Sequence, residues 1–175
     1  MISNNERLKK LESQMRFGHC ADSQDAVGKT HGDPARLMAV YLYYIRECTR
    51  KDFPDLNTLR KLFGTETEPY GGYIDKRGEA KATRRMVFLG DCKCSTRIDG
   101  YGVHLAWVRH TSNVDIRLME GCHLHIDCFD GSHVRIKAES PLCMCRVRVY
   151  GNAIVTIDGH TECVSITNTT KKTYH

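Results

Sequence analysis

Cysteine and histidine are the residues of this 175-residue chain with the clearest potential for metal or redox chemistry. Four of the nine cysteines form two C-x-C pairs, Cys92/Cys94 and Cys143/Cys145. No C-x-x-C occurs, and the C-x-C spacing does not match that of a zinc ribbon. An odd number of cysteines, without a secretory signal, predicts reduced thiols in an intracellular, cytoplasmic protein.

His123, His125, His133 and Cys128 lie close together in the sequence, and all four are residue types that bind zinc. In an alternating strand pattern, however, the three histidines fall on the polar side and Cys128 on the apolar side. One metal site cannot easily take ligands from both faces of a strand. We therefore expect surface histidines, no bound metal, and a buried Cys128 that packs as a small hydrophobic residue.

A catalytic triad could be assembled from His104, His110 and Asp99 only with a serine that no spacing supplies. The chain contains no G-x-S-x-G, no glycine-rich phosphate loop and no H-E-x-x-H. The outward acids of the second half are scattered among basic residues rather than paired as in a glycosidase. We therefore predict no catalytic residue, no cofactor and no enzymatic activity.

A short repeat dominates the second half of the chain. Pairs of apolar residues flank a single residue, and the first members of successive pairs are 11, 10, 10, 11, 10 and 9 residues apart. This alternation predicts about eight short β-strands with one apolar and one polar face. The pairs are Val103/Leu105, Val114/Ile116, Leu124/Ile126, Val134/Ile136, Cys145/Val147, Val155/Ile157 and Val164/Ile166. Cys92, Cys94, Cys143 and Cys145 share the apolar parity, and we expect them to be buried.

Three folds satisfy the alternation: a single-chain β-solenoid with two repeats in each turn, an intertwined trimeric β-helix, and an antiparallel sandwich. A sandwich has no reason to repeat its sequence at a fixed period, so the pattern favours a solenoid. The polar faces carry Arg135, Lys137, Arg146 and Arg148, which we expect to form the contact face for a protein partner.

The segment 112–167, with Gly151-Asn152-Ala153-Ile154-Val155-Thr156-Ile157 as its clearest unit, resembles the decapeptide β-repeat modules of uncharacterised bacterial and prophage proteins. The resemblance covers about a third of the chain. It implies a solenoid-like β-domain of mobile-element origin, which includes a virion component among the roles to consider. It implies no catalytic residues.

The first half of the chain is predicted to be helical. We expect a helix over 4–17, a loop over 18–32 and a helix over 34–51, begun by the N-cap Asp33. A short helix should run from Leu56 to Phe63. The whole pattern is that of an α+β protein with a helical cap or oligomerisation region, a basic connector, a β-repeat domain and a polar tail. We expect the helical cap or oligomerisation region at 1–64, the connector at 65–85, the β-repeat domain at 86–168 and the tail at 169–175. Trp107 is expected in the core or at the seam with the cap.

Net charge and hydropathy narrow the classes of function. No apolar run is long enough to span a membrane, and the net charge of +5 is spread over both halves of the chain. The sequence predicts a non-enzymatic structural or protein-interaction module that self-associates as a dimer or trimer. The alternative is a nucleic-acid-binding or regulatory protein that uses basic residues of the helical half and connector. These candidates are Arg60, Lys61, Lys76, Arg77, Arg84 and Arg85.

Overall fold

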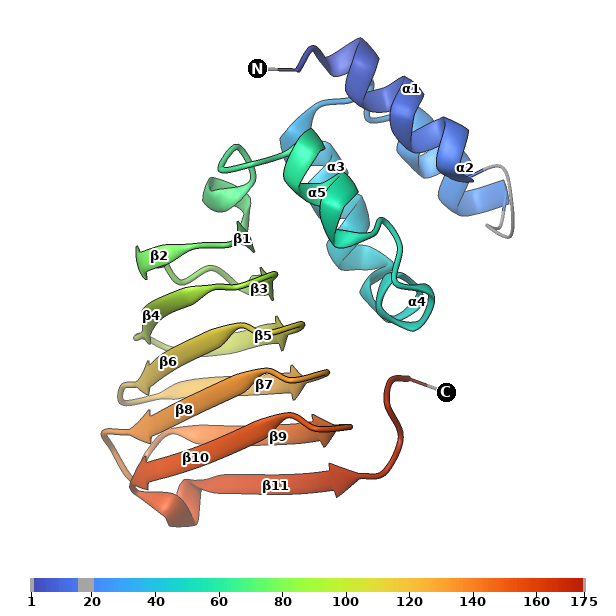
Figure 1. Cartoon of the computed structure of the whole chain (residues 1–175). Helices are drawn as coiled ribbons and strands as arrows, with labels where there is room; N and C mark the ends of the chain where they lie inside the picture. Colours follow the sequence, from blue (N-terminus) through green and yellow to red (C-terminus); the bar gives the residue numbers. More distant parts are fainter. Residues whose placement is uncertain (1, 16–20, 175) are drawn as a thin grey trace.

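The computed structural model describes residues 2–15 and 21–174, which form a helical region followed by a parallel β-solenoid (Figure 1). The solenoid that the repeat predicted is confirmed, and it makes about 5 turns. The helices are α1 (Asn4–Met15), α2 (Ala21–Gly28), α3 (Pro34–Tyr43), α4 (Ile45–Lys51) and α5 (Leu56–Leu62).

Successive strands of the solenoid alternate between two sheets, and every pairing between neighbours is parallel. Sheet A contains β1 (Gly72–Ile74), β3 (Arg85–Leu89), β5 (Gly102–Val108), β7 (Cys122–Cys128), β9 (Met144–Tyr150) and β11 (Val164–Thr169). Sheet B contains β2 (Arg77–Glu79), β4 (Lys93–Ile98), β6 (Asn113–Leu118), β8 (His133–Ala138) and β10 (Ile154–Gly159). Each strand pairs with the strand two places along the same chain, so two repeats make one turn. This pairing contradicts both the antiparallel sandwich and the intertwined trimer.

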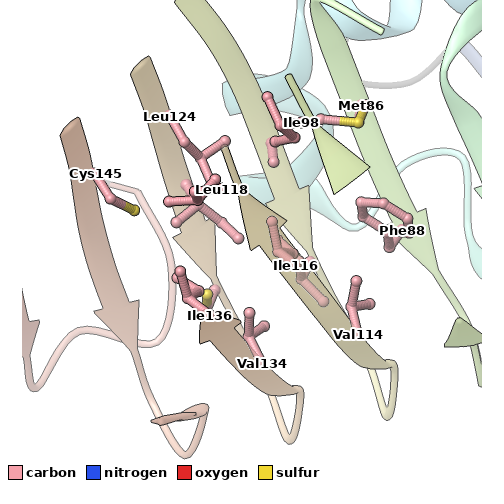
Figure 2. Packing of buried hydrophobic residues seen from close by; sticks show 14 of the residues in the cluster. Met86, Phe88, Ile98, Val114, Ile116, Leu118, Leu124, Val134, Ile136 and Cys145 are labelled. Atoms are coloured by element: carbon pink, nitrogen blue, oxygen red, sulfur yellow. The ribbon is translucent and has the colours of Figure 1, made fainter. Parts of the chain in front are cut away.

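The interior between the two sheets is filled by the apolar side of the alternation. Val114, Ile116 and Leu118 are at most 1% exposed, and the equivalent residues of neighbouring strands pack against them (Figure 2). Neighbouring strands of a sheet lie about 4.8 Å apart, so each apolar side chain sits directly on its counterpart in the next turn. The cysteines predicted on this side, from Cys92 to Cys145, are buried as well.

The parity expected for β5 was wrong. His104 and Ala106 align with the interior residues Leu124 and Ile126, which places Val103 on the outer face with 52% of its surface exposed. The outer face of this strand is apolar where the helices cover it, so both sides of β5 carry hydrophobic residues. Alternation alone cannot assign the interior side of such a strand.

The solenoid begins earlier than predicted. The stretch 65–85, expected to be a connector, contains β1 and β2, and Tyr73 and Ala80 within it belong to the solenoid core. Both strands have only three residues, too few for alternation to be detected. With β3, which also precedes the first expected strand, the eight expected strands become eleven within the described residues.

Two of the helix boundaries also differ from the prediction. Residues 21–28, expected within a loop, form α2, whose Val27 is buried in the helical core. The predicted helix 34–51 is divided at Tyr44 into α3 and α4, while the N-cap Asp33 accepts a hydrogen bond from the backbone amide of Arg36, as expected. The end of the predicted helix 4–17 and the start of the predicted loop 18–32 lie partly outside the described residues.

The helices close one end of the solenoid and overlap the adjoining part of sheet A (Figure 1). Val87, Leu89 and Trp107 share a buried cluster with Met38 and Leu59, which confirms the seam position expected for Trp107. No helix within residues 2–15 and 21–174 is long and apolar enough to cross a membrane.

Candidate interaction surface

The outer side of sheet B is a broad exposed surface. Nine outward side chains of β4, β6 and β8, hereafter the sheet B face, are all exposed. Their strands pair in register, so the side chains form three columns that run across the strands. The columns are Lys93–Asn113–His133, Ser95–Asp115–Arg135 and Arg97–Arg117–Lys137.

The third column stacks three cations on adjacent strands. Like charges directly opposite each other in a sheet repel, so such a column requires nearby carboxylates. Glu139 meets this need by accepting from Arg117 at 2.7 Å and from Lys137 at 3.1 Å. Asp99 lies 3.3 Å from Arg97.

Ion pairs balance the charge of the whole face. The face has five cations and one carboxylate of its own, Asp115, and four further carboxylates contact it. Arg135 donates to Asp158 at 2.6 Å, for example, and Lys93 lies 3.7 Å from Asp91. Five cations therefore face five carboxylates, of which Asp91 is shared with Arg77 of β2.

The four expected contact residues do not form a single face. Arg135 and Lys137 lie on β8 of sheet B, whereas Arg146 and Arg148 lie on β9 of sheet A. The reason is that successive repeats fall in opposite sheets. Repeats that share a face are two repeats apart, and this is how the sheet B face brings in Arg97 and Arg117, which sequence reasoning had not singled out.

Three of the six basic residues proposed for nucleic-acid binding are engaged with carboxylates. Arg60 donates to Asp75 at 2.6 and 2.8 Å, and Lys76 donates to Glu68 at 2.6 Å. Arg77 likewise donates to Asp91 at 2.7 Å. Lys61, Arg84 and Arg85 are exposed, but they do not form one basic stripe. Lys61 lies on α5, whereas Arg84 directly precedes β3 and Arg85 begins it.

The histidine cluster is separated by the fold. His123 lies on sheet A and His133 on sheet B, so these equivalent repeat positions do not stack. Within the described residues, no three histidine, cysteine or acidic side chains gather in a way that could hold a metal ion. Burial raises the pKa of the Cys145 thiol to about 12, so this interior sulfur is a poor nucleophile.

Sheet A carries a polar site that sequence reasoning missed. Asp127 lies on the polar side of the alternation in β7, yet it is only 4% exposed because the C-terminal segment covers it. Its two carboxylate oxygens accept from Arg148 at 2.7 and 3.0 Å, and one of them accepts from the hydroxyl of Tyr174. The indole nitrogen of Trp107 donates to the same hydroxyl at 3.0 Å. The predicted polar tail 169–175 therefore includes a docked residue, and the tail's sequence carried no periodic signal for this contact.

A second polar cluster joins the helices to the turns of the solenoid. Arg109 is buried, donates to Asp52 at 2.9 Å and lies 3.7 Å from Asp130. Next to it, Nδ1 of His110 accepts from the backbone amide of Gly90 at 3.0 Å. Burial, and secondarily the charge of Arg109, lowers the pKa of His110, so this imidazole is neutral and serves as a structural acceptor.

The helical region itself contains an apolar pocket of about 480 Å³. Leu11, Val27, Leu37 and Met38 are among the residues that line it. Cys48 also lines the pocket, but burial raises the pKa of its thiol to about 12. The pocket therefore offers space for an apolar group rather than an activated nucleophile.

Searches of protein-family models, curated proteins and solved structures found no match for this chain. The solenoid architecture that the decapeptide-repeat resemblance implied is present, and no family is identified. Fold and surface together define the chain as a parallel β-solenoid with a helical cap at one end.

Proposed function

We propose that this protein is a non-enzymatic structural or interaction module that presents the sheet B face to a protein partner. The observation that carries the proposal is that face itself. The parallel pairing of the strands holds nine exposed side chains in register. Ion pairs with neighbouring carboxylates restrain the lysine and arginine side chains among them. A surface that is ordered before binding loses little conformational entropy when a partner docks.

The charge balance of the face favours a protein partner over a nucleic acid. Binding to nucleic acid depends on unneutralised cations that replace the counterions of the phosphates. Asp115 and the four carboxylates that contact the sheet B face equal its cations in number, so the face has little net attraction for a polyanion. A protein surface with its own mixed charges can instead form ion pairs with the side chains of the three columns. Such pairs fix how the two proteins are aligned on each other.

The interior chemistry supports a non-enzymatic role. The cysteines of the solenoid core serve as packing residues, and the polar clusters around Asp127 and Arg109 are used to dock the tail and the helices. Each of these groups has a structural partner that accounts for its position.

Charge reversal on the sheet B face tests the proposal. The variant carries Arg117→Glu and Lys137→Glu, and a matched control carries Lys9→Glu and Lys10→Glu on the exposed side of α1. Immobilised wild type, variant and control are each incubated with a nuclease-treated extract of the source cells, and retained proteins are identified by mass spectrometry. Equal urea midpoints would show that both variants are folded.

We expect at least one protein to be retained by the wild type and the control, and retention by the sheet B variant to fall at least tenfold. Equal retention by all three proteins would overturn the proposal. The proposal would also be overturned if the wild type retained nucleic acid from an extract without nuclease treatment, and if only an Arg84→Glu, Arg85→Glu variant lost that retention. This result would favour the nucleic-acid alternative.

A further inference from the structure

The last turn of the solenoid leaves its interior open. Ile166 points inward in register with Val147, yet 44% of its surface is exposed, whereas Val147 is 1% exposed. Val155, Ile157 and Val164 of the same turn are only partly buried. The opposite end is closed, because β1 packs beneath the helices and a Cβ added at Gly72 would meet Met38 of α3. Figure 1 shows β10 and β11 at the end farthest from the helices.

The two strands at the open end are unprotected edges. Within the described residues, β10 pairs only with β8 and β11 pairs only with β9, so one side of each backbone is unpaired. Proteins usually protect such edges with lysine, proline or very short strands. Neither strand contains a lysine, arginine or proline, and Asp158, their one charged residue, is paired with Arg135. At the helical end, by contrast, β2 has only three residues, two of them charged.

The C-terminal segment turns away from this end. The carbonyl of Lys171 accepts from the backbone amide of Gly151, and Tyr174 docks on the outer face of sheet A against Asp127. Figure 1 shows this segment rising from β11 toward the level of α4. The described tail therefore leaves the edges of β10 and β11 uncovered.

We propose that the open end binds the same end of a second copy, to give a closed two-fold dimer. The adjacent edges of β10 and β11 run in opposite directions in the two sheets, and a two-fold axis across the end places antiparallel edges opposite each other. Neither edge strand carries an unpaired charge, so no like-charge repulsion between the strands themselves opposes the contact. Assembly stops at two copies because each helical cap blocks the other end.

This inference concerns a surface separate from the sheet B face, and it does not depend on the proposed function. Its test is the mass of the reduced protein measured by sedimentation or light scattering across a hundredfold range of concentration. The variant is Ile166→Lys, which places a charge at the open end. The control is Val103→Lys, which changes a similarly exposed apolar residue on β5, away from that end.

We expect the wild type and Val103→Lys to have twice the 20.0 kDa mass of the chain, with dissociation at low concentration. In Ile166→Lys the dissociation constant should rise at least tenfold, while the circular dichroism spectrum and urea midpoint of the monomer are kept. A wild type that is monomeric or trimeric at every concentration would overturn the inference. A dimer that is weakened by Val103→Lys and unaffected by Ile166→Lys would also overturn it.

Discussion

Replacement of Asp127 by asparagine should release the C-terminal tail from the solenoid and lower stability. The carboxylate is 4% exposed and accepts hydrogen bonds from Arg148 and Tyr174. Asparagine keeps the size of the side chain but removes its charge, and it turns a donating amide group toward donors. The substitution therefore isolates the electrostatic part of the contact.

The expected cost follows from the exposure of the partners. Hydrogen bonds to a charged group contribute about 1.5–3 kcal/mol each, and removal of one partner of a fully buried pair costs about 3–5 kcal/mol. The Arg148 side chain is 45% exposed, so water recovers part of the loss. We therefore expect the free energy of unfolding to fall by about 2 kcal/mol, and Tm to fall by about 4–8 °C for a domain of this size.

Urea unfolding at a fixed protein concentration measures this change, and the fluorescence of Trp107 reports on the tail directly. Trp107 is the one tryptophan of the sequence, is 8% exposed and donates to Tyr174. Release of the tail should shift its emission to longer wavelength, and Tyr174→Phe should produce a weaker shift in the same direction.

The matched control is Asp91→Asn, which breaks the exposed pair with Arg77 and should leave both the urea midpoint and the emission unchanged. Asp127→Asn protein with the stability and emission of the wild type would refute the docking of the tail.

Three further outcomes follow from the interior and the seam. Ile116→Ala should lower the free energy of unfolding by about 3 kcal/mol because it leaves a cavity between the sheets, while Arg117→Ala should change the urea midpoint little; equal effects would contradict the assigned faces. Because the pKa of His110 is lowered from 6.5 on folding, the unfolded chain binds the proton more readily, and stability should be lost as the pH falls through about 6.5. His110→Asn, which keeps an acceptor, should flatten that part of the pH profile, and a profile identical to that of the wild type would exclude this role. Cys128 and Cys145 should resist alkylation in the native protein and react in urea, as read by peptide mass mapping; modification of either in the native state would contradict their burial.

The solenoid could be predicted from the sequence wherever one face is buried and the other is wet. Val114 and Ile116 satisfy that condition, since their neighbours Asp115 and Arg117 are exposed. The condition fails in β5, where the helices bury part of the outer face and Val103 was assigned to the wrong side. Alternation reports on burial, and an element buried on both sides has no alternation to detect.

The candidate surface was predicted only in part, because a period does not state which repeats share a face. Arg135 and Lys137 lie together on the exposed sheet B face, but Arg146 and Arg148, which were expected beside them, lie on the other sheet. To assign each repeat to one of the two sheets, one needs the number of repeats in each turn. Backbone geometry, rather than residue type, sets that number. The burial of Asp127 depends on a tail residue distant in the sequence, and no local pattern records such a contact.

Hydrogen–deuterium exchange of the free and partner-bound protein would test the central claim most directly. The captured partner is added in excess, and exchange is followed by peptide across the chain. The proposed function predicts additional protection of residues 93–98, 113–118 and 133–138, which are the strands of the sheet B face, with α1 unchanged. Protection confined to the helical pocket or the seam, with these strands unchanged, would contradict it.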